Sequence, residues 1–266
     1  MDPFLLVERD GPVVIVSFNR PDERNTITEP SQAEEIVAFC HQMTRDRSVR
    51  AIVLTGSGKA FCAGGNVKDM QNREGMFAGS PYAIRNNYRT SFQMIGPALS
   101  ELEVPVVAAI NGPAIGLGLD IACMADIRLM ADNAVVAESY VKLGIIPGGG
   151  GAWLLPRLIG PQRAALMTLT GDAITAAKAL EYGLVAEVVP AADLRARAIE
   201  VAQSIAANPG HATRLAKRLM REGADVKMDT LQQMAAAFQA LSHHTADHHE
   251  AIDAFLGKRP GEFRGE

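Results

Sequence analysis

Two short apolar segments, each followed by a glycine-rich turn, constrain the fold of this chain more than any other feature. Residues 50–56 (RAIVLTG) lead into FCAGG, and residues 105–110 (PVVAAI) lead into NGPAIGLG. Both segments have the length and composition of buried strands, and a helical pattern follows each turn. This alternation of strands and helices predicts an α/β fold.

The rest of the chain extends the alternation and ends in helices. Asp10 and Gly11 separate two apolar runs as the turn of a β-hairpin does. Helices are expected over 29–46, 82–102, 147–160 and 161–171, and further strands over 126–131, 134–138 and 184–190. The end of the chain reads as helical over 192–206, 210–222 and 227–256. We therefore expect a core over residues 1–190 and a helical C-terminal region over 191–266.

Composition excludes several classes of protein. A net charge of -4 over 266 residues gives no indication of binding to nucleic acid or to an anionic membrane surface. The first residues, MDPFLLVERDG, lack the basic and apolar regions of a signal peptide, so none is expected. The three cysteines (Cys40, Cys62 and Cys123) form no C-x-x-C pair, which indicates reduced thiols and a cytoplasmic location.

The two glycine turns suggest a shared chemical role. A strand that turns through glycine into a helix leaves backbone N–H groups unpaired, and such groups favour negative charge. One such turn is most simply a tight loop. Two in one chain are also consistent with an oxyanion hole, in which one N–H from each turn meets a single oxygen.

Long motifs connect the chain to a known family. FCAGGNVKDM at 61–70, NGPAIGLGLDIACMADIRLMAD at 111–132 and LGIIPGGGGAWLLPRLIG at 143–160 stand in this order. The first resembles the F-x-A-G-x-D-[IL]-x-E signature of the crotonase, or enoyl-CoA hydratase/isomerase, superfamily, and the other two resemble its next two motifs. Further matches at 19–25, 170–189 and 254–263 extend the similarity over residues 4–263.

The resemblance implies a fold, a substrate class and an assembly. The fold would be a crotonase-like spiral of repeated strand-strand-helix units, and the helical region over 191–266 would form trimers or hexamers. The substrate would be an acyl-coenzyme A thioester, with no permanently bound cofactor and no metal. By motif position, the backbone N–H groups of Gly65 and Leu117 would hold its carbonyl oxygen.

The resemblance also implies the contacts to coenzyme A. Backbone groups of the first motif would contact adenine and pantetheine, at Ala63, Gly65, Asn66, Val67 and Lys68, with Leu117 on the second turn. Arg24 and Lys258 would reach the phosphates, and an ordinary solvated side chain is the alternative for each. Asn66 replaces the usual aspartate, so the local helix cap is expected to differ.

The catalytic positions depart from the family pattern. Hydratases of the family carry two glutamates, and those positions hold Asp120 and Tyr140 here. We expect Asp120 to act as base or acid and Tyr140 to orient substrate or water, because tyrosine ionises near pH 10. The alternatives are a helix-terminal role for Asp120 and a pocket-wall role for Tyr140. Glu138 is a reserve carboxylate that would share a strand face with Tyr140 if the strand continued.

Three functions follow from these departures. The first is an enoyl-CoA hydratase or isomerase that uses an enolate and Asp120. The second is a thioester or carbon–carbon bond hydrolase on the same scaffold, and the third is a non-catalytic acyl-CoA-binding protein. His244 and His248 stand four residues apart as a metal pair would, but a solvated helix face is the expected reading.

Overall fold

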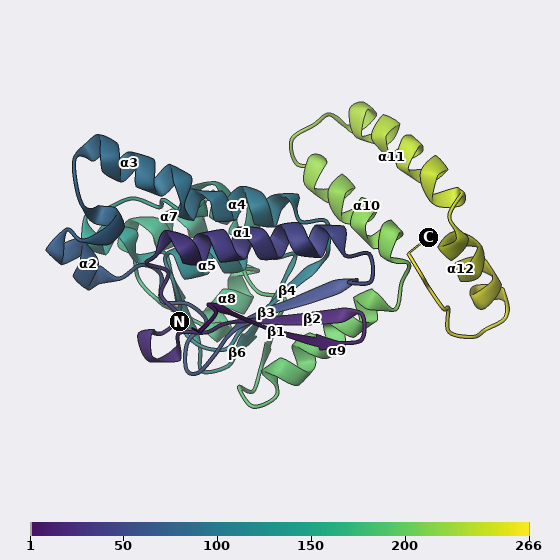
Figure 1. Ribbon diagram of the computed structural model, residues 1–266, viewed down its shortest axis with the longest axis horizontal. Coiled ribbons are helices and arrows are strands. Elements are labelled where there is room, and N and C mark those ends of the chain that lie inside the picture. Colours follow the sequence, from purple (N-terminus) through teal and green to yellow (C-terminus); the bar gives the residue numbers. More distant parts are fainter. Residues whose placement is uncertain (1, 266) are drawn as a thin grey trace.

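A computed structural model describes residues 2–265 of the chain and has a mixed α/β architecture (Figure 1). Its main sheet has six strands in the order β1-β2-β3-β4-β6-β9. The β1–β2 hairpin is antiparallel and every other neighbouring pair in this sheet is parallel. The strands are β1 (Leu5–Asp10), β2 (Val13–Phe18), β3 (Ala51–Gly56), β4 (Val106–Ile110), β6 (Ile127–Ala131) and β9 (Glu187–Val189).

A second, smaller sheet lies beside the glycine turns. It has three strands in the order β5-β7-β8, which are β5 (Ala114–Ile115), β7 (Val135–Ala137) and β8 (Ile174–Thr175). β5 pairs parallel to β7, and β7 pairs antiparallel to β8. The two-residue strands β5 and β8 carry too little pattern for sequence analysis to detect, and it missed both of them.

Helices cover the sheet. Figure 1 shows α1 and α4 on one side of the main sheet and α9 on the other. Along α9 the buried residues recur every fourth position, and three of them are alanines that let the helix approach the strands closely. The helices before the tail are α1 (Pro30–Arg45), α2 (Val67–Asn72), α3 (Pro81–Thr90), α4 (Phe92–Glu101), α5 (Leu117–Met124), α6 (Gly151–Ile159), α7 (Pro161–Thr170) and α8 (Ala176–Tyr182).

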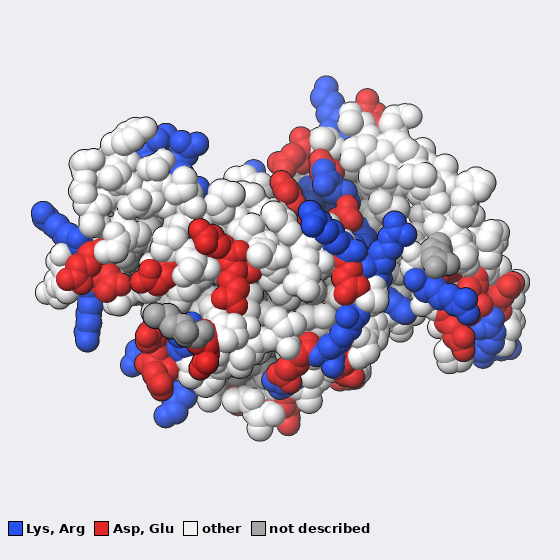
Figure 2. All heavy atoms as spheres, in the orientation of Figure 1, with Lys and Arg blue, Asp and Glu red and all other residues white. Residues whose placement is uncertain are grey.

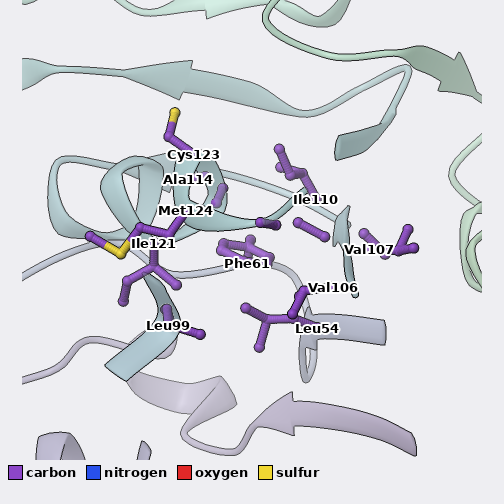
Figure 3. Packing of buried hydrophobic residues seen from close by; sticks show 14 of the residues in the cluster. Leu54, Phe61, Leu99, Val106, Val107, Ile110, Ala114, Ile121, Cys123 and Met124 are labelled. Atoms are coloured by element: carbon purple, nitrogen blue, oxygen red, sulfur yellow. The ribbon is translucent and has the colours of Figure 1, made fainter. Parts of the chain in front are cut away.

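The apolar core holds the first glycine turn in place. Phe61, directly before the turn, is fully buried and meets Phe18 edge-on at a ring-centroid distance of 5.6 Å. Figure 3 shows it between Leu54 and Val106 on one side and Ile121 on the other. Burying a side chain of this size contributes roughly 1.5–3 kcal/mol, so the turn is anchored by its own sequence.

Three of the elements predicted from the sequence have different bounds in the structure. The helix expected over 82–102 is two helices, α3 and α4, because the chain bends at Ser91 (φ -130°, ψ -93°). The helix expected over 227–256 is also two, because Thr245 caps a new helix by accepting a hydrogen bond from the His248 N–H. The strand expected over 134–138 ends at Ala137, and the 3₁₀ helix η3 (Ser139–Leu143) follows. Glu138 and Tyr140 therefore do not share a strand face.

Within residues 2–265, four helices follow β9, and the first of them packs on the main sheet. They are α9 (Leu194–Ala206), α10 (Gly210–Glu222), α11 (Met228–His243) and α12 (Ala246–Leu256), and Figure 1 shows the last three projecting from the core. Arg214 ties α10 to the core by donating to the carbonyls of Thr44, Asp46 and Val49. The division of the chain into a core and a C-terminal region after residue 190 stays a prediction. The first helix after that point, α9, packs on the main sheet of the core.

The face of the molecule shown in Figure 2 carries both positively and negatively charged side chains. Figure 2 shows Lys and Arg side chains interspersed with Asp and Glu over the core and the C-terminal helices. Among residues 2–265, no helix is both long and apolar enough to cross a membrane.

Candidate active site

The two glycine turns lie against each other. The Ile115 N–H donates to the Cys62 carbonyl at 3.0 Å, and the Cys62 N–H donates to the Pro113 carbonyl at 3.2 Å. Gly118 has no room for a side chain, because an added Cβ would overlap the backbone of Cys62. The turn after β3 and the turn after β4 are thus joined at backbone level.

Gly65 and Leu117 face the same cavity across this junction. Gly64 (φ +83°) and Gly116 (φ +55°) adopt left-handed backbone that favours glycine, so each turn can reverse sharply. Among the loop and cap hydrogen bonds of residues 2–265, none is donated by the N–H of Gly65 or Leu117. Both donors remain available to a ligand.

The cavity is mostly apolar and partly aromatic. Its volume is about 30 Å³. Phe77 and Phe92 each meet Tyr88 edge-on at ring-centroid distances of 6.4 Å. The lining residues are Gly65, Met70, Phe77, Tyr88, Phe92, Leu117, Tyr140, Ile145, Gly148 and Gly149.

Tyr140 and Asp120 form a polar pair at the wall of this cavity. The Tyr140 hydroxyl donates to Asp120 Oδ2 at 2.8 Å. Tyr140 lines the cavity, whereas Asp120, in the first turn of α5, is 0% exposed and lies behind it. In this structure Asp120 therefore lies behind the cavity wall, against Gly149 and the tyrosine hydroxyl.

Burial dominates the electrostatics of the pair. It raises the pKa of Asp120, and the hydrogen bond from Tyr140 opposes that rise. Burial also raises the pKa of Tyr140, and the charge of Asp120 raises it further. The phenol therefore keeps its proton at neutral pH and donates it to the carboxylate.

Glu138 is a third buried group behind the pair. It directly precedes η3 and is 0% exposed. Within the described chain, neither of its carboxyl oxygens has a hydrogen-bond partner, and neither does Asp120 Oδ1. An added Cβ at Gly151 would overlap both Glu138 Oε1 and Asp120 Oδ1, so these two oxygens lie beside each other.

Most residues expected to bind coenzyme A gather around the first turn. Asn66 caps α2 by accepting a hydrogen bond from the Lys68 N–H at 2.9 Å, so the cap survives the replacement of aspartate. The Ala63 N–H donates to the Arg24 carbonyl at 3.0 Å, which places Arg24 beside this turn with an exposed side chain. Val67 is half exposed on the adjoining helix.

Lys258 does not join this group within one chain. It lies after α12, at the opposite end of the long axis from α2 (Figure 1). Among the histidines of the same region, His243 Nδ1 and His248 Nε2 are 2.9 Å apart, and His244 takes no part in this contact. The described residues contain no group of three potential metal ligands.

Sequence analysis missed two features of the site: the aromatic side chains that line the cavity, and the glycines that pack on Asp120 and Glu138. Tyr88 and Phe92 come from the region 82–102 that was predicted as one helix, and Phe77 precedes that region, so their convergence was not visible. Gly149 and Gly151 were part of a glycine run with no phosphate-binding pattern, yet they pack directly on Asp120 and Glu138. The absence of side chains in that run was the only available signal.

The chain is similar over nearly its whole length to proteins of one family. A sequence model of the enoyl-CoA hydratase/isomerase family matches residues 8–266. The chain is 32% identical to 1,2-epoxyphenylacetyl-CoA isomerase of Escherichia coli (strain K12) over the full length of both proteins. It is 33% identical to the short-chain-enoyl-CoA hydratase of Clostridium acetobutylicum, covering 96% of this chain and 95% of that protein. The crystal structure of an enoyl-CoA hydratase from Bacillus anthracis superposes with a TM-score of 0.92 at 35% identity, covering 99% of this chain and 100% of that one.

Proposed function

The chain belongs to the enoyl-CoA hydratase/isomerase family, and on this premise we propose that it isomerises the double bond of an enoyl-CoA thioester through an enolate. One observation carries the proposal. A single cavity is lined by Gly65 and Leu117, whose N–H groups make no loop or cap hydrogen bond in residues 2–265, and by Tyr140.

The backbone donors would stabilise the enolate. When the carbon next to a thioester carbonyl loses a proton, negative charge develops on the carbonyl oxygen. Two fixed N–H groups at Gly65 and Leu117 would bind that oxygen, and each such donor contributes roughly 10²–10³ in rate. A backbone donor requires no particular side chain, so leucine at position 117 is compatible with this role.

The proton would pass through the tyrosine. The Tyr140 oxygen would take the proton from the α- or γ-carbon while its own proton moves along the 2.8 Å hydrogen bond to Asp120 Oδ2. The reverse transfer would then return a proton to the other carbon and complete the shift of the double bond. Asp120 remains the final base, as its motif position predicts, with Tyr140 as the group that meets the substrate.

The lining of the cavity favours isomerisation over hydration. Hydration requires a water held between two acid/base groups, such as the glutamate pair of the hydratases. Of Asp120, Glu138 and Tyr140, only Tyr140 is among the residues that line the cavity, and most of the other lining side chains are apolar. One relay is enough to move a single proton between two carbons of the same substrate.

Coenzyme A would lie along the first turn. We propose backbone contacts from Ala63, Gly65, Asn66, Val67 and Lys68, with the exposed Arg24 on a phosphate. Lys258 is too far away within one chain, so its phosphate contact requires a neighbouring copy in a trimer or hexamer. The three cysteines are free and buried, which supports a cytoplasmic location.

A panel of thioesters tests the proposal. The protein is incubated separately with 3-enoyl-CoAs and 2-enoyl-CoAs of several chain lengths, and the conjugated thioester, added water and free thiol are followed. Isomerisation predicts that 3-enoyl-CoA converts to its conjugated isomer with unchanged mass. Water addition would support a hydratase instead, thiol release a hydrolase, and binding without turnover a non-catalytic protein.

A further inference from the structure

Glu138 is a buried carboxyl group that the mechanism above leaves unused. It directly follows β7, and its side chain lies beside that of Asp120. Both carboxyls contact Gly151, the first residue of α6. It does not line the cavity, so it cannot meet the substrate in this structure. Its position behind Asp120 is nevertheless specific, because Gly151 has no room for a side chain between the two carboxyls.

The surroundings of Glu138 contain no cation to balance two negative charges. Arg128 acts on the neighbouring Cys123, and its guanidinium donates to the carbonyls of Leu184 and Ala125. Burial raises the pKa of the Cys123 thiol to about 12, so it stays neutral. The charged and titratable groups around the pair are Asp120 and Cys123 from α5, Tyr140 from η3, Tyr88 from α3 and Arg128 from β6, while α6 contributes backbone at Gly151.

Two adjacent buried carboxyls without a cation cannot both ionise near neutral pH. The free oxygens fit a shared proton, since a proton on Glu138 directed at Asp120 Oδ1 would give both groups a partner. The other oxygen of Asp120 already accepts a hydrogen bond from Tyr140. Of the two carboxyls, Asp120 is therefore the one whose ionised form is better stabilised.

We infer that Glu138 is a positioning residue that holds one proton for the carboxyl pair and thereby keeps Asp120 as the ionised acceptor for Tyr140. This inference rests on the proposed function for its effect on rate, but not for the protonation state itself. Burial raises the pKa of Glu138 and the Asp120 charge raises it further, in agreement with the geometry.

If the two carboxyls share one proton, kcat/KM should change twice as the pH rises. At low pH both carboxyls are protonated, and Asp120 cannot accept the proton of Tyr140. At high pH both are ionised, and the second charge strengthens the hold of Tyr140 on its proton. The active form carries one proton, so kcat/KM should be bell-shaped with pH.

Glu138→Gln separates positioning from simple packing. The amide keeps the volume and still donates to Asp120, but it cannot ionise. Activity at neutral pH should stay within about tenfold of wild type, and the basic limb of kcat/KM across roughly pH 5 to 10 should disappear. Glu101→Gln, an exposed change on α4, is the matched control and should keep both limbs. A Glu138→Gln variant with the wild-type basic limb would overturn the inference.

Infrared spectroscopy of the unliganded protein tests the protonation state without any turnover. At about pH 7 the wild type should show the carbonyl stretch of one buried protonated carboxyl. Glu138→Gln should lose this band, whereas Asp120→Asn should keep it because the remaining buried carboxyl stays neutral. Absence of the band in wild type, or its persistence in Glu138→Gln, would contradict the inference even if the enoyl-CoA assays fail.

Discussion

Replacing Gly151 by alanine should disable the proton relay while the backbone stays intact. Gly151 is the first residue of α6 and is not among the glycines with positive φ, so alanine fits the local backbone. The added Cβ would instead overlap Glu138 Oε1 and Asp120 Oδ1. Both carboxyls are fully buried, so they must move within a packed interior to make room.

The magnitude follows from the size of that movement. Inserting one methyl into a packed core typically costs about 1–3 kcal/mol of unfolding free energy. The displaced Asp120 would lengthen or break its 2.8 Å hydrogen bond to Tyr140. Because a displacement of about 1 Å in a catalytic group can cost roughly 10²-fold in rate, we expect turnover to fall by about that factor.

The assay compares turnover of the best enoyl-CoA with urea unfolding of the same preparation. Gly210→Ala is the matched control, because Gly210 is the first residue of α10 and an added Cβ there meets Arg50 Cγ only at 3.4 Å. The control should keep both activity and stability. If Gly151→Ala also kept wild-type turnover, the carboxyl pair would not be part of the relay.

Three further predictions test other parts of the account. Leu117→Pro removes one N–H at the first position of α5, where proline is tolerated. Its turnover should be roughly 10²–10³-fold lower than that of Leu117→Ala, which keeps the N–H. Equal rates in the two variants would exclude the backbone donor. Burial lowers the pKa of Lys217 to about 8. Between this value and about 10.4 the unfolded chain therefore binds a proton that the folded chain lacks, and the unfolding free energy of wild type should rise with pH relative to Lys217→Met by on the order of 1–3 kcal/mol at fixed protein concentration. Light scattering at micromolar concentration should give a trimer or hexamer, because α10 to α12 leave large apolar side chains such as Phe255 exposed, and a monomer would refute the assembly.

The fold was largely predictable because its strands and helices carry clear periodic patterns. The hairpin around Asp10, the strands at 51–56 and 106–110, and the helices α1 and α9 all fall within a few residues of expectation. The errors arose where a tertiary contact decides the outcome. The bend at Ser91 is held by its hydroxyl, which donates to the Asn87 carbonyl at 2.6 Å, and a serine within an apolar periodic run gives no sign of this.

The site was predictable only in part. Motif position led to Asp120 and Tyr140, and the structure brings their side chains into contact. The order in which they face the cavity depends on η3, which holds Tyr140 and follows a strand predicted over 134–138, so no strand pattern could place Tyr140. The burial of Glu138 depends on α6 and its leading glycines, so it required long-range packing that no local pattern encodes.

Exchange of the α-proton in deuterated water tests the central claim most directly. The protein is incubated with a saturated acyl-CoA, which can form an enolate but cannot isomerise, and deuterium at the α-carbon is followed by mass spectrometry. The account predicts deuterium incorporation by wild type, slowed by roughly 10²–10⁴ in Asp120→Asn and strongly slowed in Tyr140→Phe, with thioester affinity nearly unchanged. Incorporation at the wild-type rate in both variants would contradict proton transfer through Tyr140 and Asp120.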